Sequence, residues 1–436
     1  MRLSKSWPLL TACVVARLAA QQPSPLTPEQ FFRLAGAGLR SVEQERSGYW
    51  QPHVANSHRR ILDAASMCER RSTALVLGAG NCTEIPLHEL AQRFDEVVLL
   101  DLDDASMAAA VEDLPDELIP KVHLSVQDVT RFAAPLMRRL WRAVEESETA
   151  EQSFERISEA LSNVEADDGP PTYPDADLVV SSLVFSELHR YPLSYASRLV
   201  RDKFGKRFAD SAGYGRFRAR LQQVALRDHV GLLAGSCRRG GAVYFADTIA
   251  RGPVYQKVAQ ARKREVLLAM LPDLARLGLF GQLRNQELLR DTFSAAFEKI
   301  RPRWDGGEQP SREKTLGVIE RLAADPQAPP EPDRGAASET TVNLLCNERF
   351  DLSAEVEAFE RLLALYAAVP DAFEPLVPLQ ALQSEWSSRG LAAQGAPQSW
   401  WWLEYPCSIA YSSGAFQVRS WVLKHPNGMP RAGLLN

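Results

Sequence analysis

The hydrophobic pattern of this chain alternates between short continuous apolar runs and longer stretches in which apolar residues recur every three or four positions. Five apolar runs are predicted to be strands, at 74–77, 96–101, 121–128, 177–182 and 241–247. Continuous apolar runs of this length are typical of parallel strands that helices cover on both faces. The pattern therefore predicts a doubly wound α/β domain with a mostly parallel sheet.

Helical periodicity precedes and interrupts the predicted strands. A helix over 27–39 opens with proline at its first helical position, and a second helix is expected over 56–69. Tyr49 and Trp50 lie between them, beside a glycine. Such an aromatic pair belongs either to the core or to a flap over a bound ligand.

Two long segments separate the strands. Residues 131–170 are acid-rich and helical in pattern, and 251–385 form a mostly helical block with a Pro/Ala/acid-rich loop near 323–339. The chain length also favours more than one compact unit. We therefore divide the chain into a leader with a helical segment (1–70), a cofactor-binding core (71–250), a helical insertion or lid (251–385) and closing strands (386–436).

The last predicted segment, SWWWLEYPCSIAYSSGAFQVRSWVLK, contains two β-rich runs around Ser412-Ser413-Gly414, which is a hairpin signal. A hairpin cannot join two parallel neighbours. One of these final strands is therefore expected to run antiparallel to the sheet.

Composition narrows the functional classes. The chain has 436 residues, 45% hydrophobic and 24% charged, which is typical of a soluble globular protein. The net charge of -5 gives no overall nucleic-acid signature. Six scattered cysteines without a CxxC pair argue against a zinc knuckle and against a dense disulfide scaffold, and they favour a cytoplasmic protein with reduced thiols.

The N-terminus weakly imitates a secretory signal over residues 1–22, although Arg17 interrupts its apolar run. That run is too short to cross a bilayer, which takes about 20 apolar residues, and no other segment reaches this length. A cleaved leader and a start codon assigned too far upstream both remain open.

The stretch ALVLGAGNCTEIPL has the pattern of a strand, a tight turn and a helix. Gly78 and Gly80 let the backbone approach a ligand, and a following helix offers free N–H groups. A dinucleotide fold prefers G-x-G-x-x-G, but the third glycine is replaced by Thr83. The turn predicts a nucleotide cradle and leaves an NAD(P)-dependent oxidoreductase as an alternative.

Two carboxylates end predicted strands. Asp101 follows Gly80 by twenty-one residues, where it can accept both hydroxyls of an adenosine ribose; alternatively it is the N-cap of the next helix. Asp128 ends the third strand, where it can take an adenine amino group. Alternatively, it caps a turn before Thr130.

Five motifs together, LVLGAGNC, VVLLDLD, SVQDVT, DADLVVSSLVFSELH and GGAVYFADT, resemble those of the class I S-adenosylmethionine-dependent methyltransferases. The resemblance implies a seven-stranded sheet closed by an antiparallel hairpin, S-adenosylmethionine as cofactor, and in-line methyl transfer. With neighbouring positions included, the expected cofactor contacts are Gly78, Ala79, Gly80, Asn81, Glu84, Asp101, Leu102, Asp128, Val129, Ser181, Ser182 and Tyr49.

One position departs from the family pattern. The family often carries an acid just before the first glycine, where this chain has Val76 and Leu77. Either Glu84 substitutes for that acid, or the methionine end of the donor is held differently.

The loop after the fourth strand, SSLVFSELHRYP, is where an acceptor is expected to approach. Glu187 or His189 is the candidate catalytic base, with positioning supplying most of the acceleration. Alternatively, both residues cap a helix and pair with Arg190. His53 and His58 lack a carboxylate at metal-ligand spacing, so no metal site is expected.

The basic stretch 201–229 carries interleaved aromatic residues. This mix fits a nucleic-acid surface, although a solvated amphipathic helix is the commoner explanation. A small-molecule acceptor is favoured over RNA, because the helical block can enclose a compact substrate and the net charge does not attract a polyanion. A non-catalytic scaffold that binds S-adenosylmethionine is the remaining alternative.

Overall fold

A computed structural model of the protein describes residues 27, 30–31, 50–130, 132–164, 175–208, 211, 213–252, 373–403 and 415–425. The chain divides into two compact units. The first comprises Met1–Ile249, Leu376–Trp401 and Gln417–Asn436, and the second comprises Ala250–Pro375 and Trp402–Phe416. The expected leader at 1–22, Tyr49, the loop near 323–339 and most of the 251–385 block lie outside the described residues.

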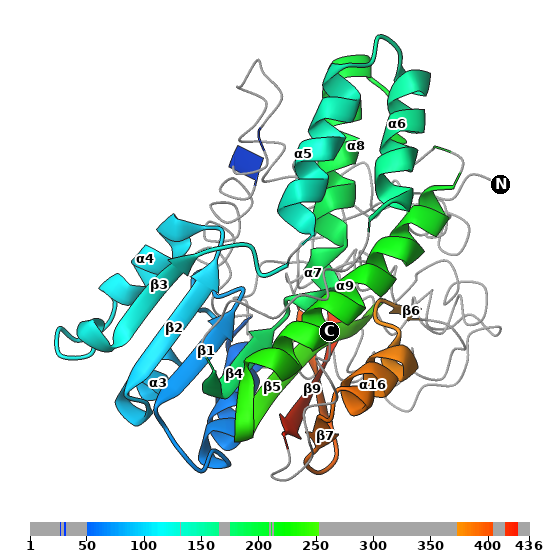
Figure 1. Ribbon diagram of the computed structural model, residues 1–436. Helices are drawn as coiled ribbons and strands as arrows, with labels where there is room; N and C mark the ends of the chain where they lie inside the picture. The colour runs from blue at the N-terminus through cyan, green and yellow to red at the C-terminus, as the bar shows by residue number, and fades with distance from the viewer. Residues whose placement is uncertain are drawn as a thin grey trace, which may run out of the picture. The chain divides into compact units, whose positions relative to one another are not determined.

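Five parallel strands form the main part of the sheet, in the spatial order β3-β2-β1-β4-β5 (Figure 1). All five lie where the apolar runs predict them, and the order is that of a doubly wound fold. Their bounds are β1 Thr73–Leu77, β2 Glu96–Asp101, β3 Val122–Val126, β4 Ala176–Ser182 and β5 Cys237–Gly252. The α/β fold with a mostly parallel sheet is thus confirmed.

The sheet continues past β5 with strands from the C-terminal part of the chain. The neighbour of β5 is β9 (Ala415–Lys424), which pairs with β8 (Gln398–Leu403) and antiparallel with β7 (Ala392–Ala393). A two-residue strand, β6 (Glu374–Pro375), pairs antiparallel with β5. The described sheet has nine strands, of which β6 and β7 have two residues each; the turn expected between β8 and β9 lies outside the described residues.

Contacts along β9 give its direction relative to β5. The carbonyl of His425, just past β9, accepts from the N–H of Gly240 at 3.0 Å. Four residues back, the Trp421 ring packs against Phe245, with ring centroids 5.9 Å apart. His425 thus lies beside Gly240 and Trp421 beside Phe245, so residue numbers fall along β9 as they rise along β5. The two strands are therefore antiparallel, as the hairpin signal predicted.

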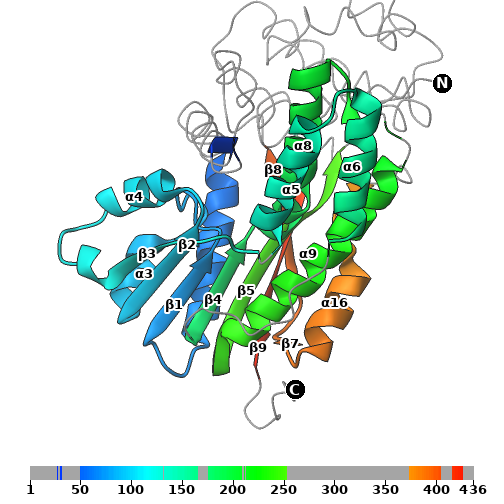
Figure 2. The ribbon, with the colours of Figure 1, turned by 45° about the horizontal axis from the view of Figure 1, so that its top comes forward.

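Helices cover the sheet and form a group at the ends of its strands. Both views show α5, α6 and α8 packed together on the side where the parallel strands end (Figures 1 and 2). The predicted helical segment 131–170 contains two of them. The bounds are α3 Leu87–Arg93, α4 Asp104–Glu112, α5 Ala133–Glu145, α6 Ala150–Ser162, α7 Phe185–Leu188, α8 Arg190–Phe204, α9 Tyr214–Ser236, α16 Leu379–Ser388 and a 3₁₀ turn at Ile119–Lys121.

The helix expected over 56–69 occupies 50–66. The prediction was wrong at both ends: within the described residues the helix already includes Pro52, which is tolerated in a first turn because its missing N–H has no intrahelical acceptor there, and it stops before Glu69. The earlier start brings Trp50 and His53 into the helix, and both side chains are buried.

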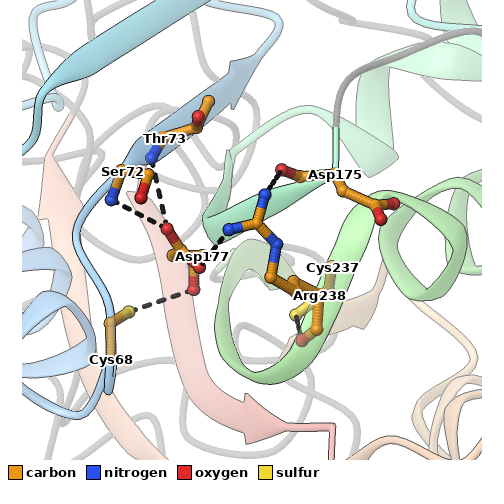
Figure 3. A network of polar contacts seen from close by, with 7 residues as sticks. All are labelled: Cys68, Ser72, Thr73, Asp175, Asp177, Cys237 and Arg238. Carbon is orange, nitrogen blue, oxygen red and sulfur yellow. Dashed lines mark hydrogen bonds and ion pairs between the residues drawn. The ribbon is translucent and has the colours of Figure 1, made fainter.

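A buried aspartate fixes the edge of the sheet where the parallel strands begin (Figure 3). Asp177, in β4, accepts from the backbone N–H of Ser72 at 2.8 Å and of Thr73 at 3.3 Å. Its other oxygen pairs with the guanidinium of Arg238 at 3.0 Å, and its carbonyl accepts from the Cys68 thiol at 3.1 Å. These bonds tie the starts of β1, β4 and β5 together, at the edge opposite the strand ends that carry the site.

Candidate functional site

The glycine turn follows β1 and is tied to the neighbouring strand. Gly78 and Gly80 have φ of 63° and 49°, a region that favours glycine. The N–H groups of Gly78 and Ala79 both donate to the carbonyl of Leu100 in β2. A side chain at Gly78 would lie 2.7 Å from a methyl of Val184, whereas one at Gly80 would meet nothing within 4 Å. Gly78 thus permits close packing, and Gly80 faces open space.

The turn orients the carboxylate of Asp101, at the end of β2. One carboxylate oxygen accepts from the N–H of Gly80 at 2.9 Å, and the other accepts from the N–H of Asp103 at 2.9 Å. Burial raises the pKa of Asp101, and these two backbone bonds oppose the rise. The N-cap of α4 is Asp103, which accepts from Ser106. Asp101 is therefore not that cap, and each of its oxygens keeps acceptor capacity.

The carboxylate of Asp128 is engaged in local structure. It accepts from the N–H and hydroxyl of Thr130 at 2.8 and 2.9 Å, and from the N–H of Ala134 at 2.8 Å. These bonds connect the end of β3 to the first turn of α5. The alternative of a turn cap before Thr130 is present, and an adenine contact by Asp128 stays a prediction.

The helix expected after the turn, over 87–90, is present as the first part of α3. Residues 81–86 are irregular, and α3 begins only at Leu87, after Pro86 at its N-cap. Cys82 has a φ of 56°, so the chain bends once more before the helix. The donors near the turn are therefore loop amides, and α3 supplies no N-terminus next to Gly80.

The segment 81–86 also carries Glu84. Its carboxylate lies 3.6 Å from Nε2 of His53, and Nε2 of His58 lies 3.1 Å from the carbonyl oxygen of Thr83. Both histidines belong to the helix 50–66. Within the described residues, no group of three His, Cys, Asp or Glu side chains could hold a metal ion.

The end of β4 presents its two predicted serines to opposite faces of the sheet. The Ser181 hydroxyl and His229 Nε2, from α9, are 2.8 Å apart. Burial lowers the pKa of His229 to about 4, so its ring is neutral at pH 7. Ser182 faces the other side, near the hydroxyl of Tyr244. The next residue, Leu183, has a φ of 58°, an uncommon conformation for a side-chain-bearing residue.

The two candidate bases after β4 differ in environment. Glu187 forms an ion pair with Arg190, and both side chains are partly exposed. His189 is buried, its Nδ1 has no hydrogen-bond partner among the described residues, and burial lowers its pKa to about 3. A histidine with so low a pKa is a weak proton acceptor at neutral pH. Pairing of Glu187 with Arg190 was the alternative, and it is present.

Asp247, in the second half of β5, was missed by the sequence reasoning. It is fully buried and accepts from the N–H of Ser186 at 2.7 Å and of Thr248 at 2.6 Å. Burial raises its pKa to about 6. The available signal was the one used for Asp101 and Asp128: an acid directly after a buried apolar run.

The remaining predicted cofactor contacts lie at or just after the ends of the parallel strands. Asn81, Leu102 and Val129 are half-buried and adjoin the glycine turn, Asp101 and Asp128 in sequence. Together with Ala79, Ser181 and Ser182, they follow or end β1, β2, β3 and β4, whose carboxyl ends share one edge of the sheet.

The aromatic residues of the basic stretch 201–229 pack on each other. Phe208 is fully buried, with ring centroids 5.7 Å from Tyr214 and 6.3 Å from Phe217. Phe154 of α6 lies 5.8 Å from the same ring. The Phe208 ring is therefore unavailable for base stacking, whereas Tyr214 and Phe217 are only half-buried.

Comparisons with known proteins give limited similarity. No family model matches the chain, and no curated protein matches it. Similar solved structures are an O-methyltransferase family protein from Burkholderia thailandensis (13% identity, 73% of this chain and 62% of that one, TM-score 0.27) and PKMT2 from Rickettsia typhi with AdoHcy (11%, 86% and 54%, 0.28). A third is a SAM-dependent methyltransferase from Thiobacillus denitrificans with S-adenosyl-L-homocysteine (10%, 98% and 100%, 0.27).

The chain spans 62% and 54% of the length of the first two of these proteins. All three are methyltransferases, the class that the sequence motifs resemble. At TM-scores below 0.5 the likeness carries no functional argument, which rests on the site itself. Among the helices of the described ranges, none is long and apolar enough to cross a membrane.

Proposed function

We propose that the chain is an S-adenosylmethionine-dependent methyltransferase that acts on a small-molecule acceptor. The observation that carries the proposal is the carboxylate of Asp101, which the N–H groups of Gly80 and Asp103 orient at 2.9 Å each. It ends β2 beside a glycine turn whose Gly80 faces open space. Its remaining lone pairs suit a pair of vicinal ribose hydroxyls. Because the carboxylate is already fixed in position, the entropic cost of ordering it on binding is small.

The residues of the strand ends have distinct parts in this proposal. Gly78 and Ala79 form the turn against β2, Gly80 lets the donor approach the backbone, and Asp101 holds its ribose. The remaining cofactor contacts are Asn81, Glu84, Leu102, Asp128, Val129, Ser181, Ser182 and Tyr49. The bound donor would supply an electrophilic methyl group on a sulfonium. Methyl transfer then depends chiefly on how the acceptor is positioned.

Glu187 is our candidate for the proton acceptor on the acceptor side. Its carboxylate is partly exposed in the loop after β4 and is oriented by Arg190. His189 was the other candidate, but burial lowers its pKa to about 3. We therefore assign His189 a part in the packing of this loop rather than in proton transfer.

Calorimetric titration tests the function. Purified protein is titrated separately with S-adenosylmethionine, S-adenosylhomocysteine, NAD and NADP. We expect saturable binding of the two adenosyl-sulfur ligands alone, followed by methyl transfer to a member of a small-molecule acceptor panel. Binding of a nicotinamide cofactor alone would replace the proposal by an oxidoreductase. Tight donor binding without turnover on any acceptor would favour a scaffold.

A further inference from the structure

Two histidines of the helix 50–66 contact the loop that follows the glycine turn. His58 Nε2 lies 3.1 Å from the carbonyl oxygen of Thr83, and His53 Nε2 lies 3.6 Å from the Glu84 carboxylate. A carbonyl oxygen only accepts hydrogen bonds, so His58 carries its proton on Nε2. The helix thus reaches adjacent residues of one loop with two imidazoles.

The protonation of His53 is determined by a residue far away in sequence. The indole N–H of Trp400, in β8, donates to His53 Nδ1 at 2.9 Å, across 347 residues. An indole nitrogen is a donor only, so Nδ1 must be the bare nitrogen and the proton of the ring lies on Nε2. This proton is on the side of the ring that faces Glu84.

The order Trp400, His53, Glu84 has an electrostatic consequence. A second proton on Nδ1 would confront the indole N–H and break their hydrogen bond. The N–H of His53 therefore points toward the Glu84 carboxylate, whose nearer oxygen lies 3.6 Å from Nε2. His53 is 1% exposed and the Glu84 side chain 20%, so the carboxylate is restrained on its inner side and reachable from outside.

We propose that Trp400 and His53 are positioning residues that hold Glu84 to receive the ammonium group at the amino-acid end of the methyl donor. The proposal rests on the proposed function and deepens it. Glu84 lies four residues after Gly80, where an added Cβ would meet nothing within 4 Å. The positions just before the first glycine are Val76 and Leu77, so no acid is available there for the same task.

Binding of two ligands distinguishes a positioning role of Trp400 and His53 from a general structural effect of their replacement. S-adenosylhomocysteine carries the amino-acid end, whereas 5′-methylthioadenosine has the same nucleoside without it. Dissociation constants of both are measured for wild type and for Trp400→Phe, which keeps the ring and removes only the N–H. The matched control is Trp401→Phe, one residue further along β8. Glu84→Gln and the double variant Glu84→Gln/Trp400→Phe complete the set.

We expect Trp400→Phe to weaken S-adenosylhomocysteine binding about 2- to 12-fold, the loss of one hydrogen bond, and to leave 5′-methylthioadenosine binding unchanged. Glu84→Gln should weaken the first ligand by about tenfold or more, because a charged partner is lost, and adding Trp400→Phe to it should cost nothing further. Trp401→Phe should resemble wild type.

Equal weakening of both ligands, or no weakening of either, would overturn the assignment of Trp400 and His53. Because Glu84 is on a partly exposed loop, Glu84→Gln is a second route to the answer if Trp400→Phe does not fold. Wild-type protein that binds neither ligand would instead overturn the proposed function. The two failures are therefore distinguishable.

Discussion

The carboxylate of Asp247 accepts a hydrogen bond from the backbone N–H of Ser186 at 2.7 Å, and this bond joins β5 to the first turn of α7. The side chain is fully buried. Thr248 donates to the other carboxylate oxygen at 2.6 Å. Since α7 contains Glu187, a buried acid in one strand sets the position of the loop that we assign to the acceptor.

Asp247→Asn tests the charge of this acid. Burial raises its pKa from 3.8 to about 6, so its contribution to stability is full below pH 3.8 and is lost as the pH rises through 6. The wild type should therefore lose about 3 kcal/mol relative to Asp247→Asn between acid and neutral pH. Urea unfolding at several pH values from about 3 to 7.5, which spans both the unfolded and the folded pKa, measures the difference. Parallel pH curves for the two proteins would contradict the shifted pKa.

His229 should contribute with the opposite sign. Burial lowers its pKa from 6.5 to about 4, so its stabilising effect is present above pH 6.5 and is lost as the pH falls through 4. His229→Gln should remove about 3 kcal/mol of acid sensitivity relative to wild type. The same unfolding series measures it. The matched control is His123→Gln, at a histidine whose side chain is 56% exposed.

The two glycines of the turn should differ in their tolerance of alanine. Gly78→Ala adds a methyl 2.7 Å from Val184 at a φ of 63°, whereas Gly80→Ala meets only the strain of a φ of 49°. We expect about 2 to 4 kcal/mol of destabilisation at Gly78 and about 1 to 2 kcal/mol at Gly80. Thermal or urea unfolding gives both values.

A double-mutant cycle identifies the source of the difference. If the contact with Val184 causes the larger loss of stability at Gly78, then Val184→Ala should restore part of the free energy of unfolding in the Gly78→Ala background. Additive losses would mean that backbone strain alone accounts for Gly78. The expected pattern at Gly80 is different: its alanine variant should lose only the backbone strain of about 1 to 2 kcal/mol but should be impaired in nucleotide binding, because the added methyl points into open space.

The strands β1 and β4 were predictable from sequence because burial on both faces requires continuous apolar runs, whereas β3 is largely exposed. The same reasoning found the acids Asp101 and Asp128, since a carboxylate after such a run lies at the edge where strands end. It did not show how each acid is used. Asp103 rather than Asp101 caps α4, and Asp128 is bonded to Thr130 and Ala134.

Contacts between distant segments left no signal in the sequence. The bond between Trp400 and His53 spans 347 residues, and no periodicity relates two such positions. The pattern gave His53 and His58 only as an unlikely metal pair. Their common target, the loop 81–86, became visible only when the helix 50–66 was seen beside the sheet.

Asp101→Ala is the most direct test of the candidate cofactor site. Removal of a carboxylate that holds ribose hydroxyls should weaken S-adenosylhomocysteine binding by about 1 to 3 kcal/mol. The matched control is Asp95→Ala, at an exposed acid directly before the first residue of β2, and this variant should bind like wild type. Because Asp101 also accepts from Gly80 and Asp103, each variant is first checked for folding by circular dichroism. Within the described residues, Asp101 is the strand-end acid that accepts from the N–H of Gly80. Unchanged affinity in a folded Asp101→Ala protein would therefore refute the ribose contact.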